Sequence, residues 1–251
     1  MKKLFTLACA IGLAFMGYSQ TYLSEDFSTF THDTIPPLVS GWKNIDSSAT
    51  MNGQTWRFND VRARPTGLPI DADYAIIDSD DYGSGNSQDA YLVSANFDAS
   101  LATVVTLEFD HYHRALGSTA EIQVFDGIAW VTVASYPATT ANPAHETIDI
   151  TAAAAGVANA QIRFHYTGTY AWYWILDNII VYQPTPDDIK ALAVDSLVSG
   201  CGLGMESVSF RFTNVGSTTI TNVPVQYSVK GGALLIEPKL GVVIPGIKPP
   251  T

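Results

Sequence analysis

The sequence has 251 residues, of which 47% are hydrophobic and only 15% are charged. This balance is sufficient to build a buried core and excludes an intrinsically disordered chain. The formal net charge of −11 excludes binding to nucleic acid or to anionic lipid through a general positive field. The 19 Gly, 13 Pro, 12 Tyr, 11 Phe and 5 Trp residues indicate many short strands joined by tight turns.

The first segment is typical of a secretion signal. Two lysines precede an apolar run over residues 4–16, and small residues at Gly17 and Ser19 fit a cleavage site. The run is shorter than the ~20 residues that cross a bilayer as a helix, and no later segment is long and apolar enough to do so. We therefore expect residues 1–19 to be a signal peptide and the mature protein to be secreted or surface-bound. A short membrane anchor is the alternative.

Residues 20–183 have the two-residue periodicity of strands with one buried face, which predicts an antiparallel β-sandwich. The alternating segments are residues 104–112, 121–125, 130–133 and 160–166. Asp126-Gly127, between the second and third of these segments, predicts a tight hairpin. The helix-like tract at residues 152–155 is long enough for one turn only.

A short proline-containing segment divides the chain. Residues 184–188 contain two prolines, which prevent helix and central-strand pairing, and they predict a linker. The following residues, 189–251, predict a second all-β domain. Its expected strands are residues 191–198, 206–213 and 223–229, with turns at 214–217 and 230–232. Because an immunoglobulin-like sandwich takes ~100 residues, we expect a truncated Ig-like sandwich and a longer multidomain chain.

An acidic stretch between Arg64 and Arg114 contains no other lysine or arginine. Its carboxylates are Asp71, Asp73, Asp78, Asp80, Asp81, Asp89, Asp98, Glu108 and Asp110. Such charges are costly to bring together unless water or a cation neutralises them. The segment at residues 78–89 partly matches an EF-hand loop but departs from it at Tyr82 and at Asp89, and its flanks are predicted strands. We expect Ca²⁺, not an EF-hand, with Asp78 and Asp80 as candidate ligands. A solvated acidic loop is the alternative.

Two pairs of residues could carry catalysis. Glu108 and Asp110 share a strand face, a spacing seen in sandwich glycosidases, but His113 replaces the acid that those enzymes need further along. His111 and His113 align two imidazoles, which are either a transition-metal pair or core or surface histidines. Hydrolase, metalloprotease and phosphate-loop motifs are absent from the sequence. We therefore expect no enzymatic activity, with a glycoside hydrolase using Glu108 and Asp110 as the alternative.

Trp172 and Trp174 point to the same face if their segment is extended. Planar aromatic rings pack against the apolar faces of sugars, so the two tryptophans are predicted ligand-binding residues. The alternative is that they fill the sandwich interior.

Several short motifs follow one another in an order known from secreted bacterial domains. They are Glu25-Asp26-Phe27, Pro36-Pro37, Gly41-Trp42, Trp56, residues 89–94, residues 107–110, residues 124–130, residues 148–150 and residues 174–179. This order resembles the cleaved-adhesin or choice-of-anchor J domain, a MAM-like jelly roll, over roughly residues 22–182.

The resemblance implies a non-catalytic module, often calcium-bound, in secreted or surface proteins that include adhesins and proteases exported by the type IX route. It implies calcium carboxylates at Glu25 or Asp26, at Asp89 and at Asp177. The segment from residue 195 to residue 216 resembles Ig-like domains of the CARDB type, but no closing strand is recognisable after Gly232. We expect a calcium-stabilised adhesion module that binds glycan or protein at the cell surface. The accessory domain of a larger secreted protease is the alternative.

Overall fold

The computed structural model describes residues 18–30, 41–51, 53–58, 60, 62–186, 189–195, 209–214, 216–227 and 235–243. The chain forms two compact units, one consisting mainly of Ser19–Gln183 and the other mainly of Pro184–Gly246. The signal peptide expected at residues 1–19 lies almost entirely outside the described residues. Among the residues that are described, no helix is both long and apolar enough to span a membrane.

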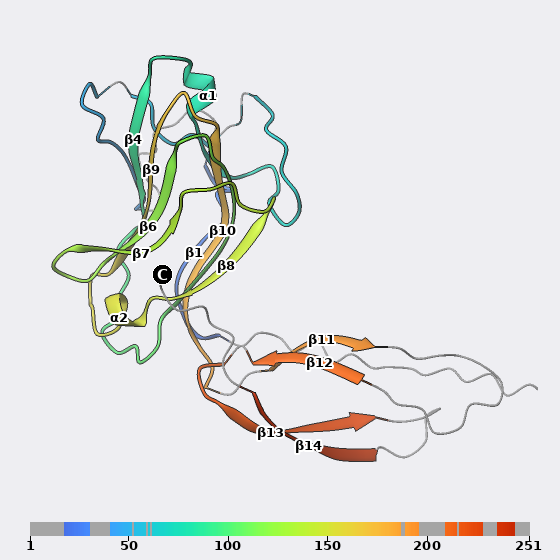
Figure 1. The fold of residues 1–251 in the computed structure, drawn as a ribbon. Coiled ribbons are helices and arrows are strands. Elements are labelled where there is room, and N and C mark those ends of the chain that lie inside the picture. The colour runs from blue at the N-terminus through green and yellow to red at the C-terminus, as the bar shows by residue number, and fades with distance from the viewer. Residues whose placement is uncertain are drawn as a thin grey trace, which may run out of the picture. The chain divides into compact units, whose positions relative to one another are not determined.

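The Ser19–Gln183 unit is a sandwich of two five-stranded sheets (Figure 1). The first, which we call the β5 sheet, has the order β1 (Tyr18–Glu25), β10 (Tyr173–Pro184), β5 (Thr106–Arg114) and β8 (Ala144–Asp149), with β3 (Ala75–Asp78) also paired to β10. The second, the β9 sheet, has the order β2 (Lys43–Asp46), β4 (Ser87–Val93), β9 (Gln161–Thr169), β6 (Thr119–Phe125) and β7 (Trp130–Tyr136). This arrangement confirms the predicted all-β sandwich.

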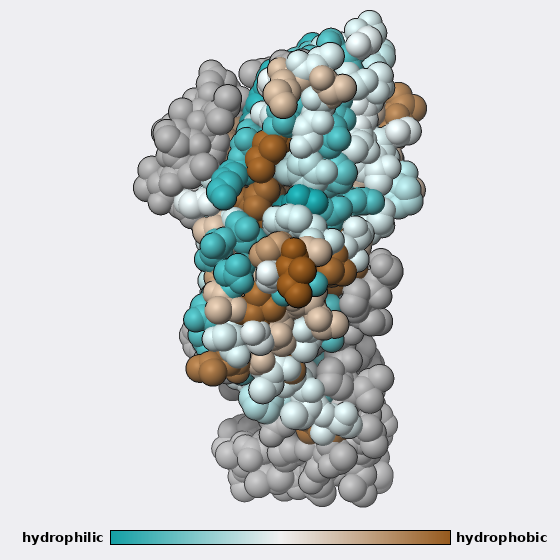
Figure 2. Space-filling model, turned by 90° about the vertical axis from the view of Figure 1, so that its left-hand side faces the viewer, coloured by the Kyte–Doolittle hydropathy of each residue, from teal (hydrophilic) through white to brown (hydrophobic). Residues whose placement is uncertain are grey.

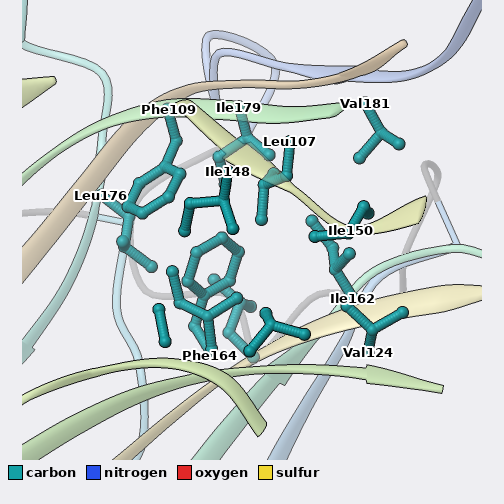
Figure 3. Packing of buried hydrophobic residues seen from close by; sticks show 14 of the residues in the cluster. Leu107, Phe109, Val124, Ile148, Ile150, Ile162, Phe164, Leu176, Ile179 and Val181 are labelled. Atoms are coloured by element: carbon teal, nitrogen blue, oxygen red, sulfur yellow. The ribbon is translucent and has the colours of Figure 1, made fainter. Parts of the chain in front are cut away.

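Alternating side chains explain how these strands pack. On β9, Ile162 and Phe164 are fully buried, whereas Arg163 and His165 are only partly buried on the other side of the sheet. Hydrophobic side chains of both sheets point toward one another between the layers (Figure 3). Burial of each Leu, Ile or Phe contributes about 1.5–3 kcal/mol. Polar side chains lie on the outer face of the β9 sheet, whereas the outer face of the β5 sheet also carries a second, smaller hydrophobic cluster that includes Tyr173 and Ile175.

A bulge interrupts this alternation in β10. The register with β5 shifts after Asp177, and Asn178 has a φ of 52°. As a result, Leu176 and Ile179 both face the core although they are three positions apart. Asp177, the last residue before the bulge, lies opposite Asp110 of β5.

Two short connections match the sequence predictions. The predicted hairpin joins β6 to β7, where the backbone N–H of Asp126 donates to the carbonyl of Ala129 and Gly127 has a φ of 91°. The predicted single turn is α2 (Thr151–Ala154). One further turn, α1 (Ser79–Tyr82), lies within the acidic stretch, where the Asp78 carboxylate accepts from the backbone N–H of Asp81.

The second unit contains two strand pairs. β11 (Ile189–Asp195) pairs with β12 (Ser209–Asn214), and β13 (Ile220–Tyr227) pairs with β14 (Leu235–Val243). A strand does follow Gly232, in the segment where the sequence showed no recognisable closing strand. β14 was hard to recognise in the sequence because it contains Pro238, and proline is unusual within a sheet. In the structure, Pro238 lies opposite Pro224 of β13.

Candidate functional site

The acidic residues of the α1 region are paired with arginines. Arg64 donates from Nε and Nη2 to the two carboxylate oxygens of Asp78, at 2.7 and 2.9 Å, and from Nη2 to Asp80 at 2.7 Å. Arg57 and Arg62 contact the two oxygens of Asp81 at 2.8 and 2.5 Å. These contacts supply positive charge to Asp78 and Asp80, which removes the reason for expecting a metal ion at these two residues.

Three other predicted calcium ligands also have partners within the protein. Glu25 accepts from the backbone N–H of Phe27 at 2.9 Å, and Asp26 accepts from the backbone N–H and hydroxyl of Ser28. Asp89 contacts His165 Nε2 at 2.9 Å. Within the described part of the chain, no group of three or more His, Cys, Asp or Glu side chains is arranged to hold a metal ion. The six predicted ligands therefore do not assemble into one site there.

Asp177 is the predicted ligand that lies among other carboxylates. Its side chain is 1% exposed and accepts from the backbone N–H groups of Asn178, at 2.7 Å, and Asp71, at 3.3 Å. Burial raises the pKa of Asp177 to about 7, and the charges of Asp71 and Asp110 act in the same direction, against the two backbone hydrogen bonds. Asp177 is therefore the best-placed of the six for a cation.

The candidate catalytic pair is held by a histidine. Glu108 and Asp110 share the outer face of β5, as predicted, and His145 of β8 contacts both, with Nε2 at 3.1 Å from Glu108 and Nδ1 at 2.9 Å from Asp110. The hydrogen bond to Glu108 raises the pKa of His145 to about 9 against partial burial, and Asp110 acts in the same direction. Both carboxylates are thus ion-paired with an imidazolium at neutral pH.

His111 and His113 are core residues, which excludes the surface-histidine alternative. Both are fully buried between the sheets. His111 Nδ1 accepts from Trp174 Nε1 at 3.1 Å, and His113 Nε2 lies 2.9 Å from the hydroxyl of Ser118. Burial lowers the pKa of His113 to about 4, so this ring is neutral at physiological pH.

The two predicted ligand-binding tryptophans do not form one platform. Trp174 is 0% exposed and belongs to the main core, so its side chain is not accessible to a ligand, contrary to the prediction. Trp172 is partly buried beside a second hydrophobic cluster, and the Arg114 guanidinium lies 3.7 Å from its ring centroid. The core alternative is correct for Trp174 only.

The outer face of the β9 sheet carries a set of aromatic and cationic side chains that the sequence did not reveal. Arg163 Cζ of β9 lies 4.2 Å from the ring centroid of Tyr91 and 4.1 Å from that of Trp130. The Tyr91 ring stacks on the His165 ring, with 4.2 Å between the ring centroids and an interplanar angle of 11°. The centroids of the Trp130 and Phe125 rings are 5.5 Å apart. We call these five residues the Tyr91–Trp130 strip.

Polar side chains border this strip. Arg163 Nε donates to Gln123 Oε1 at 2.6 Å, which fixes the guanidinium plane. His165 contacts Asp89 at 2.9 Å and Glu121 at 3.4 Å. Figure 2 views the molecule from the side on which Figure 1 draws β4, β6 and β7, and it shows hydrophobic and hydrophilic side chains interspersed over this side.

Sequence periodicity contains part of the signal for this strip. Arg163 and His165 alternate with the buried Ile162 and Phe164, so their outward direction was predictable. Tyr91 was not predictable as their neighbour. It lies opposite His165 only because β4 pairs with β9, and strand order is not encoded in local periodicity.

Comparisons with known proteins give likenesses in structure alone. No family model matches the chain, and no curated protein matches it. The structure is similar to the K3 cleaved adhesin domain of Lys-gingipain from Porphyromonas gingivalis w83, with 18% identity, a TM-score of 0.48, and coverage of 64% of this chain and 97% of that one. For the K1 cleaved adhesin domain of the same protein, the identity is 18%, the TM-score 0.45, and the coverage 64% and 98%. TmCBM61, solved in complex with β-1,4-galactotriose, is 12% identical, with a TM-score of 0.37 and coverage of 65% of this chain and 99% of that one. The choice-of-anchor J and CARDB assignments remain predictions.

Proposed function

We propose that the Ser19–Gln183 unit is a non-catalytic binding module of a secreted or surface protein, which holds a glycan or protein ligand on the outer face of the β9 sheet. The observation that carries this proposal is the contact of one guanidinium, that of Arg163, with the rings of both Tyr91 and Trp130. Tyr, Trp and Arg are the residue types that dominate binding energy at recognition surfaces.

The physical chemistry of the strip supports this role. An aromatic ring offers a large apolar surface and loses little conformational entropy when it binds. An arginine stacked on such rings is held in place, so less entropy is lost when it donates hydrogen bonds. The strip lies on a sheet, whose hydrogen bonds keep β4, β6, β7 and β9 in fixed register. Such a surface is organised before the ligand arrives.

Binding of the full chain to arrays of glycans and of extracellular proteins tests the proposal. We expect a ligand whose binding is lost in Trp130→Ala and retained in Ile128→Ala, a change of an 89% exposed side chain in the same hairpin. Binding that is equally strong in both variants would locate the ligand elsewhere. A complete lack of binding would leave only a structural role.

The absence of catalysis is part of the proposal and is supported by His145, which pairs with both carboxylates of the candidate catalytic pair. A glycosidase needs one carboxyl group as acid and the other as base or nucleophile. We expect the wild-type chain and Glu108→Gln to release equally little reducing sugar from polysaccharides. Release by the wild type that Glu108→Gln abolishes would establish an enzyme.

We also propose that Ca²⁺ stabilises the unit through Asp177. Support comes from the burial of Asp177 and from the nearby negative charges of Asp71 and Asp110, which favour a cation beside Asp177 even though His145 and Asn178 already contact Asp110. A bound ion stabilises only the folded state, so we expect the melting temperature to rise with millimolar Ca²⁺ and to fall with chelator. An unchanged melting temperature would remove calcium from the account.

A further inference from the structure

We infer that the Tyr91–Trp130 strip binds an uncharged saccharide, whose ring stacks on the aromatic side chains and whose hydroxyl groups reach Arg163, Asp89 and Glu121. This inference rests on the proposed function of this face. It goes further because it specifies a saccharide, and not a protein, as the ligand. Three properties of the strip lead to it, namely its free donors, its free acceptors and its charge.

The donors come from Arg163. Its Nε is used by Gln123, and within the described part of the chain no carboxylate forms an ion pair with the guanidinium. The two terminal nitrogens therefore remain available while the rings of Tyr91 and Trp130 hold the group in place. A guanidinium in this state donates a fork of N–H bonds to oxygen acceptors of a ligand.

The acceptors come from Asp89 and Glu121, which flank His165. Their side chains are 40% and 28% exposed, so ligand atoms can reach them. His165 contacts Asp89 Oδ1 and Glu121 Oε2, and among the described residues the other oxygen of each carboxylate accepts no hydrogen bond. A ligand on this face must therefore both accept and donate hydrogen bonds, and a hydroxyl group does both.

The charge of the face selects against ionic ligands. A uronate or sulfate ligand that reached Arg163 would approach the negative charges of Asp89 and Glu121, in a chain with a net charge of −11. Like charges at such an interface are unfavourable. A cationic ligand would meet Arg163 instead. An uncharged polyhydroxyl ring avoids both penalties, and its apolar C–H face packs against the exposed part of the Tyr91 and Trp130 rings, which are only partly buried although Arg163 lies over both.

Isothermal titration calorimetry on the full chain tests this inference. The probes are neutral hexose and pentose oligosaccharides, their uronate and sulfated counterparts, and any protein ligand found on the arrays. We expect a neutral oligosaccharide to bind, with at least tenfold weaker binding of its charged counterpart. Trp130→Ala, Tyr91→Ala and Arg163→Ala should each weaken binding at least tenfold, whereas Ile128→Ala should change it less than twofold.

The outcomes separate the two proposals. Tighter binding of a uronate or sulfated probe, or binding of a protein ligand alone, would overturn the inference that the ligand is an uncharged saccharide. The proposed binding face would still stand if Trp130→Ala abolished that binding. Binding that none of the three strip variants weakens would overturn the face as well. Arg163→Lys keeps the charge but removes the fork, so it is the check if Arg163→Ala does not fold. Undiminished saccharide binding in Arg163→Lys would contradict the role given to the guanidinium.

Discussion

Trp174 donates a hydrogen bond from its indole Nε1 to His111 Nδ1 across 3.1 Å, and both side chains are completely buried. The indole also packs against Trp56 and Phe164. This pair links β10 to β5 inside the core, so Trp174 is a core residue that stabilises the fold. Its neighbour Trp172 lies outside the main core.

Replacement of the two tryptophans should therefore have unequal effects. We expect Trp174→Ala to reduce the free energy of unfolding by about 3–5 kcal/mol, because it leaves a cavity in a packed core. Trp172→Ala should cost about 1 kcal/mol, mainly through the lost contact with Arg114. Guanidinium unfolding curves measure both values. Equal losses would mean that the two rings share one environment.

Arg64 should be essential to the acidic turn. Its side chain is 12% exposed, and we expect Arg64→Gln to cost about 3–5 kcal/mol, since Asp78 would remain buried without its counter-charge. Arg62→Gln is the matched control, because that side chain is 54% exposed, and it should change stability little. If the two variants unfold at the same denaturant concentration, the carboxylates of the turn have another source of positive charge.

The neutral, buried His113 should make the fold sensitive to acid. Its pKa is lowered from 6.5 to about 4, so between these values the unfolded chain binds a proton that the folded chain does not. The stability contributed by neutral His113 is complete above pH 6.5 and is lost as the pH falls toward 4, by on the order of 3 kcal/mol. Urea unfolding of the wild type and of His113→Gln at pH 7, 5.5 and 4.5 measures this. Identical pH dependence in the two proteins would contradict the assignment.

Local sequence patterns were sufficient for the strands and some turns. The alternation in β9 placed Ile162 and Phe164 inside, and Asp126-Gly127 marked the β6–β7 hairpin. These features depend on neighbours a few residues apart, which periodicity and turn chemistry report.

Features that depend on distant residues were not predictable. The acidic stretch was expected to need a metal because no basic residue lies within it, yet Arg64 reaches Asp78 and Asp80 from the stretch's own boundary. In β10, the bulge after Asp177 changes which positions face the core. The Tyr91–Arg163 contact requires the pairing of β4 with β9. Side-chain reach, bulges and strand order are tertiary properties.

The central claim is that the outer face of the β9 sheet binds the ligand, and NMR chemical-shift mapping during titration with a neutral oligosaccharide tests it most directly. We expect the largest shifts at the Trp130 indole N–H, the Arg163 Nε–H and the backbone amides of Tyr91 and His165, with the Trp172 indole unchanged. Shifts confined to Trp172 and Arg114, or no shifts with any ligand that binds, would contradict it.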